Sequence, residues 1–80
     1  MPLQIKIIHP DKILFEGHAE LLFAPGTKGT IGILPGHTPM FAELLKGEIE
    51  IKGEKDEIVA IESGILRVHN DEVTILASPH

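Results

Sequence analysis

The chain has 80 residues, no cysteine, and a formal net charge of −5 that arises from twelve acidic and seven basic side chains. This length allows one domain over residues 1–80, and the absence of cysteine excludes disulfides and thiolate metal sites. Because Arg67 is the single arginine, we expect no nucleic-acid partner and no direct binding to anionic lipid. No apolar run approaches the ~20 residues of a membrane-spanning helix, and the N-terminal residues resemble neither a signal nor a transit peptide, so a cytosolic chain is expected.

Short strands are predicted along the whole chain, because apolar and polar side chains alternate between clusters of turn residues. The expected strands are Leu3–Ile8, Ile13–Glu16, His18 or Ala19 to Ala24, Thr30–Leu34, Met40–Leu45, Glu48–Lys52, Glu57–Glu62, a segment around Leu66–His69, and Val73–Ala77. Met40–Leu45 is ambiguous, since its residues also permit a short helix. The spacing favours an all-β fold, an antiparallel β-sandwich or flattened barrel of about 8–10 short strands.

Most strands are expected to bury one face and to expose the other. In the third strand, Leu21 and Phe23 are expected on one face and Leu22 on the other. Two strands are expected to stop at glycine: the second at Gly17 and the seventh at Ser63-Gly64.

The segment Ala24–Pro39 concentrates turn residues, with four of the eight glycines and three of the six prolines. This density predicts two turns separated by one short strand, and any function is expected to depend on this segment. Its Gly-x-x-Gly-x-x-Gly spacing, from Gly26 to Gly32, has neither the Gly-Lys-Ser/Thr ending of a phosphate loop nor a following helix. A structural turn is therefore predicted.

Candidate metal ligands are spread along the chain rather than paired. No two of the five histidines have the short spacing of a metal site on one strand or helix. They are predicted to lie on turns and on the surface: His9, His18, His37, His69 and His80. A cupin-like metal-binding protein that uses His9, His37 and His69 remains an alternative.

No catalytic constellation is found. Neither Ser63 nor Ser78 lies in a Gly-x-Ser-x-Gly elbow, and the acidic residues between Glu48 and Glu57 are expected to form a solvated face. The chain is therefore not expected to be an enzyme, and no cofactor is predicted.

One family resembles the chain over almost its whole length. The ordered motif Pro25-Gly26-x-x-Gly29-x-Ile31-Gly32-Ile33-Leu34-Pro35-Gly36-His37-x-Pro39 is similar to that of the epsilon subunit of the rotary F-type ATP synthase, called delta in mitochondria. The segments Glu62–Val68 and Val73–Ala77 are similar to its Gly-Gly-(Phe/Ile)-x-x-Val and Val-Thr-(Val/Ile)-Leu-Ala ending.

The resemblance implies a non-catalytic β-sandwich in the central stalk, which docks the gamma subunit onto the ring of c subunits and couples proton or sodium flow to ATP synthesis. It implies that His9, His37 and Ala42 face gamma. It also implies a ring-facing loop made of Thr27, Lys28, Gly29, Thr30 and Ile31. Many members have an acidic residue where this chain has Thr30, so hydrogen bonding or apolar contact would replace a charge pair there.

Most members of that family continue after the sandwich with a helical hairpin, which residues 1–80 do not supply. The chain is expected to lack the hairpin, either through truncation or as a short member, and ATP binding by the hairpin is not carried over. The implied location is the cytoplasmic face of a bacterial inner membrane, with membrane contact only through the complex. A stand-alone β-sandwich binding module remains the alternative function.

Overall fold

The computed structural model describes residues 2–78, which form nine β-strands and no helix. The strands are β1 (Leu3–His9), β2 (Lys12–Ala19), β3 (Leu21–Gly26), β4 (Gly29–Ile33), β5 (Met40–Leu44), β6 (Gly47–Lys52), β7 (Glu57–Ile61), β8 (Ser63–His69) and β9 (Glu72–Ser78). The all-β prediction is confirmed, and the ambiguous segment Met40–Leu45 provides a strand. No helix suited to crossing a membrane is found among these residues. Pro79 and His80, on which one histidine prediction fell, lie outside the described residues.

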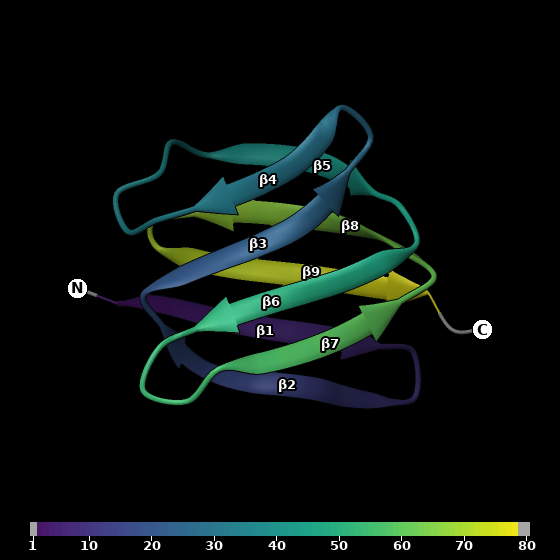
Figure 1. The fold of residues 1–80 in the computed structure, drawn as a ribbon, viewed down its shortest axis with the longest axis horizontal. Helices are drawn as coiled ribbons and strands as arrows, with labels where there is room; N and C mark the ends of the chain where they lie inside the picture. The colour runs from purple at the N-terminus through teal and green to yellow at the C-terminus, as the bar shows by residue number, and fades with distance from the viewer. Residues whose placement is uncertain (1, 79–80) are drawn as a thin grey trace.

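The strands form two packed layers that join along one side (Figure 1). The front layer contains β4, β3, β6 and β7, and the rear layer contains β5, β8, β9, β1 and β2. One bridge, Gly26 opposite Leu44, connects β3 to β5 and makes the sheet continuous between the layers. This arrangement confirms the predicted sandwich or flattened barrel.

One pairing in the rear layer departs from the antiparallel expectation. β1 and β9 are parallel, with Ile5 opposite Val73 and Ile7 opposite Ile75. A parallel pair needs a long connection, and here nearly the whole chain separates the first strand from the last. The other described pairings are antiparallel.

Two strand ends differ from the glycine-based predictions. β2 continues through Gly17 to Ala19, because residues 15–19 pair in sequence with Ile7 to Leu3 of β1. Gly64 lies inside β8 and is buried, with Leu44 and Ala77 as its neighbours across the strands. An added Cβ at Gly64 would lie 2.8 Å from the carbonyl oxygen of Leu76. Gly64 is therefore a point of close strand approach rather than a strand break.

The buried face of β3 is set by its neighbours. Leu22 and Ala24 are buried, whereas Leu21 and Phe23 are only half-buried. Leu22 pairs with Ile33 on one side and with Ile51 on the other, and all three side chains lie inside. The apolar face that the sequence suggested at Leu21 and Phe23 is thus the outer one.

The core between the layers consists of aliphatic side chains, and no polar or charged residue among the described ones is buried. Its members are Leu3, Ile5, Ile7, Ala19, Leu22, Ala24, Ile33, Leu44, Ile49, Ile51, Ile61, Leu66, Val68, Val73, Ile75 and Ala77. β-Branched residues are restricted in χ1 and pack closely on a pleated surface, so they lose little freedom in such a core. The result is a compact scaffold whose outer faces are available for contacts.

Candidate functional site

The outer face of the rear layer carries an apolar row that crosses four strands. Ile13 on β2 pairs with Ile8 on β1, which pairs with Leu76 on β9. Leu76 in turn pairs with Ile65 on β8. Directly paired residues project from the same face of a sheet, so these side chains form one continuous band. Ile13, Ile65 and Leu76 are each about half exposed.

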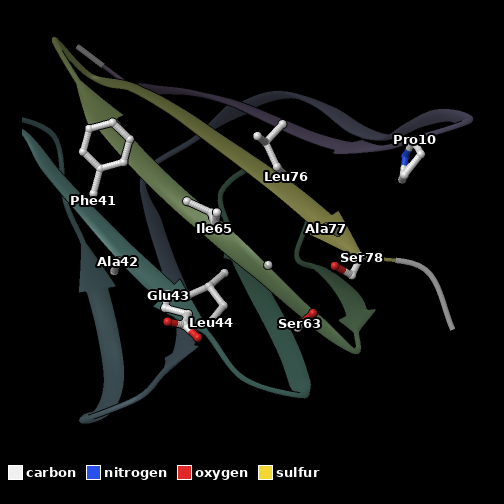
Figure 2. Close-up of a pocket in the computed structure, with 11 residues that line it drawn as sticks. Pro10, Phe41, Ala42, Glu43, Leu44, Ser63, Ile65, Leu76, Ala77 and Ser78 are labelled. Carbon is white, nitrogen blue, oxygen red and sulfur yellow. The ribbon is translucent and has the colours of Figure 1, made fainter.

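On β5, Phe41 lies on the same face two residues before Glu43, which is the residue opposite Ile65. Phe41 is the most exposed of the large apolar side chains, at 76%. Figure 2 shows Phe41, Ile65 and Leu76 projecting from the sheet into a shallow groove. The groove has a volume of about 580 Å³ and is mostly apolar in its lining. We call the surface formed by Ile8, Ile13, Phe41, Ile65 and Leu76 the apolar band.

Charged side chains lie among the apolar ones on this face. Arg67 is opposite Phe41, and Glu43 is opposite Ile65, each on the neighbouring strand of the β5–β8 pair. Both charged residues are exposed. Arg67 and Glu43 thus interrupt the apolar side chains where β5 pairs with β8. Aromatic residues and arginine are both enriched at protein–protein interfaces.

The residues that the resemblance assigned to gamma are spread along the rear layer. His9 is at the end of β1, and His37 lies in the loop before β5, at the opposite end of the molecule (Figure 1). The His37 Nδ1 atom lies 2.7 Å from the carbonyl oxygen of Thr38. Ala42 is half-buried and packs against the core, whereas its neighbours Phe41 and Glu43 project outward.

The loop that holds His37 is attached to the β8–β9 hairpin. The backbone N–H of Gly36 donates to Oδ1 of Asp71 at a distance of 2.7 Å. Asn70 and Asp71 have φ angles of 49° and 62°, as a two-residue hairpin turn with left-handed residues requires. This contact fixes one end of the rear layer.

The predicted ring-facing loop is a tight hairpin between β3 and β4 at an upper corner of the view in Figure 1. Thr27, Lys28, Gly29 and Thr30 are exposed, and Gly29 has a φ of 117° that favours glycine. Ile31 is half-buried and packs against the core. The structure therefore places Thr27–Thr30 together on the surface, whereas the Ile31 side chain points inward.

This hairpin is supported by the turn between β5 and β6. The backbone N–H of Leu45 donates to the carbonyl oxygen of Pro25 at 2.8 Å. Gly47 lies directly beneath Pro25, where an added Cβ would be 3.0 Å from the proline Cγ atom. The two turns therefore leave the sandwich at the same corner.

Metal-ligating groups do not converge in residues 2–78, where no group of three or more His, Asp or Glu side chains could hold a metal ion. His9 lies at the end opposite His37, so the three histidines of the cupin-like alternative are not gathered in one place.

Comparison with known families gives a match over residues 2–79, to the ATP synthase delta/epsilon chain β-sandwich domain. The chain belongs to this family. Among curated relatives, the ATP synthase epsilon chain of Leptospira interrogans is 40% identical over 75 residues, which cover 92% of this chain and 59% of the relative. The epsilon chain of Brevibacillus brevis is 35% identical over 77 residues, covering 94% and 58%.

Two solved structures contain a chain with the same fold. A chain of the Euglena gracilis mitochondrial ATP synthase (OSCP/F1/c-ring) aligns with a TM-score of 0.88 at 20% identity, covering 95% of this chain and 50% of that one. A chain of the Tetrahymena thermophila central stalk and c ring aligns at 0.82 and 15% identity, covering 99% and 65%. The chain thus spans somewhat over half the length of the curated relatives that it matches.

The apolar band was missed by the sequence reasoning, although a signal was present. Ile7-Ile8, Ile65-Leu66 and Ile75-Leu76 are consecutive apolar pairs within strands. Because successive side chains point to opposite faces, one member of each pair must lie outside. Such pairs on adjacent strands predict an apolar outer face once the strand order is known.

Proposed function

We propose that this domain is a non-catalytic part of the central stalk of an F-type ATP synthase. In this role it docks the gamma subunit onto the c ring and passes ring rotation to the stalk, coupling ion flow to ATP synthesis. Its location would be peripheral, at the cytoplasmic face of the membrane that holds the ring. The observation that carries the proposal is the apolar band on the outer face of the rear layer.

The band is the surface proposed to receive gamma. Exposed apolar side chains that form one continuous row on a monomer commonly mark a protein contact, and a large aromatic side chain often dominates its energy. His9 lies beside the band rather than on it, since it lines a hollow with Ala60 and Glu62 of β7 in the front layer. A partner that covers the band would lie across β5. β5 would then contact gamma through Phe41 rather than Ala42, whose side chain packs inward.

The hairpin tip at Thr27–Thr30 is the surface proposed to rest on the ring. It belongs to the front layer and projects from a corner, so it is separate from the band. Family membership supports both assignments, as do the two structural neighbours, which belong to complexes of a c ring with F1 or with the central stalk.

A coupling element must resist deformation while it carries torque. The described residues share one close-packed aliphatic core with no buried polar group. Interiors packed in this way have low compressibility and transmit strain. The single domain proposed for residues 1–80 would therefore act as a rigid spacer between gamma and the ring.

The test is the affinity for purified gamma subunit of the variants Phe41→Glu and Ile65→Glu, measured by calorimetry. We expect each to weaken binding by at least about tenfold, because a carboxylate would be desolvated in an apolar contact. The matched control is Ile58→Glu, since Ile58 is 59% exposed but lies on β7 in the other layer. It should bind as the unmodified chain does. Wild-type affinity of both band variants, with unchanged folding, would reject the band as the gamma surface.

A further inference from the structure

The hairpin tip, Thr27–Thr30, is positively charged. Lys28 is the only charged residue between Ala24 and Leu34, in a chain whose net charge is −5. Its side chain is exposed and makes no hydrogen bond or ion pair within residues 2–78. Thr27 and Thr30 are exposed in the same hairpin, and their hydroxyl groups can donate hydrogen bonds. The tip is therefore a cationic, donor-rich surface.

A second lysine emerges at the same corner. Lys46 follows Leu45, whose backbone is bonded to Pro25 at the base of the hairpin. The Lys46 side chain is 78% exposed, and its Nζ atom lies 3.9 Å from a carboxylate oxygen of Glu62, a distance typical of a weak surface pair. Leu45 itself is 50% exposed and adds an apolar side chain next to Lys46 at this corner.

Carboxylates also lie near this corner, but none of them forms an ion pair with Lys28. Glu43 projects from the outer face of the rear layer beside Ile65, and Glu48 is paired with Ala60 on the front layer. Glu62 approaches Lys46, and Asp11 belongs to the separate β1–β2 turn.

The far end of the molecule is rich in negatively charged side chains. Its turns, between β6 and β7 and between β8 and β9, are rich in exposed or half-exposed carboxylates (Figure 1). These residues are Glu54, Asp56, Glu57, Asp71 and Glu72. Lys52 and Lys55 lie in or beside the same turns, so this end carries a net negative charge, whereas the hairpin tip carries the positive charge of Lys28.

We propose that the ring loop that docks on this tip presents a carboxylate to Lys28, with Lys46 as a second cationic contact and an apolar side chain against Leu45. This inference rests on the proposed function, since it names the chemistry of the partner at the ring-facing surface. Complementary charge at a docking surface sets the register and speeds association more than it adds affinity.

The test uses the complete rotor assembly, reconstituted from this chain, its gamma subunit and the detergent-purified c ring of the same organism. Lys28→Glu is expected to reduce the association rate with the gamma–ring complex by about tenfold at low salt, and the difference should shrink as ionic strength rises. Lys55→Glu is the matched control, because it makes the same charge change on an exposed lysine of the far β6–β7 turn. It should associate as the unmodified chain does.

The partner residue is identified by reversing each acidic residue of the ring loop to lysine. One such reversal should restore association of the Lys28→Glu variant. The inference is overturned if the ring loop contains no acidic residue. It is also overturned if the Lys28→Glu and Lys55→Glu variants associate with the gamma–ring complex at equal rates. Failure of the unmodified chain to bind gamma and ring would instead reject the proposed function, so the two failures are distinguishable.

Discussion

At the scale of single residues, Gly64 gives the sharpest prediction of stability. A methyl group there would lie 2.8 Å from the Leu76 carbonyl oxygen and 3.4 Å from the Ala77 Cα atom, both in the backbone of the adjacent strand. Backbone in a paired strand moves only if the pairing yields, so Gly64→Ala should lower the free energy of unfolding by about 1–3 kcal/mol. The measurement is the midpoint of urea unfolding.

Gly32→Ala is the matched control for this prediction. The added methyl group would meet the Phe23 ring at 3.3 Å, and this ring belongs to a half-buried side chain that can turn toward solvent. The free energy of unfolding of the Gly32→Ala variant should stay within about 0.5 kcal/mol of that of the unmodified chain. Equal losses for the two variants would show that close approach to the β9 backbone does not explain Gly64.

At the scale of elements, neighbouring residues of β9 separate folding from docking. Ile75 is fully buried in the core, whereas Leu76 is 53% exposed in the apolar band. Ile75→Val should lower the free energy of unfolding by about 0.5–1.5 kcal/mol and leave gamma affinity unchanged. Leu76→Ala should do the reverse, with stability changed by less than about 0.5 kcal/mol and gamma affinity reduced about fivefold.

Urea unfolding and calorimetric titration with gamma measure the two effects on the same preparations. The prediction fails if Leu76→Ala destabilises the fold as much as Ile75→Val does, because Leu76 would then be a structural residue.

The elements themselves were largely predictable from the sequence, whereas their pairing was not. Strict alternation, as in Leu3–Ile7, fixes which side chains lie inside because only one set is apolar. In Leu21–Ala24 every residue is apolar, so the buried set depends on Ile33 and Ile51 of neighbouring strands. The parallel pairing of β1 with β9 likewise depends on contacts between the two ends of the chain, which local patterns do not contain.

The candidate surfaces were predictable to different degrees for the same reason. The hairpin tip is local in sequence, so the glycines and prolines of Ala24–Pro39 indicated it directly. The apolar band draws on β1, β2, β5, β8 and β9, so it exists only once the strand order is set. The resemblance supplied His9, which lines a hollow with residues of β7, and His37, but it did not supply Phe41, the most exposed side chain of the band.

At the scale of the whole molecule, the proposed role requires that two surfaces act together while each serves its own partner. The band lies on the rear layer and the tip projects from the front layer, and no described residue belongs to both. Changes at the two surfaces should therefore act independently, since they share no partner. Phe41→Glu should weaken the binary complex with gamma and leave binding to the isolated c ring unchanged, whereas Lys28→Glu should do the reverse.

Both variants should nevertheless fail in one common assay, the retention of the c ring on immobilised gamma through this chain. A bridge needs both contacts at once, and its apparent affinity reflects their joint engagement, so loss of either surface should lower ring retention by about tenfold or more. The Ile58→Glu and Lys55→Glu controls, which change exposed residues away from both surfaces, should retain the ring fully. If Phe41→Glu loses gamma binding but still holds the ring on gamma, the ring reaches gamma by another route, and this domain is not the bridge between them.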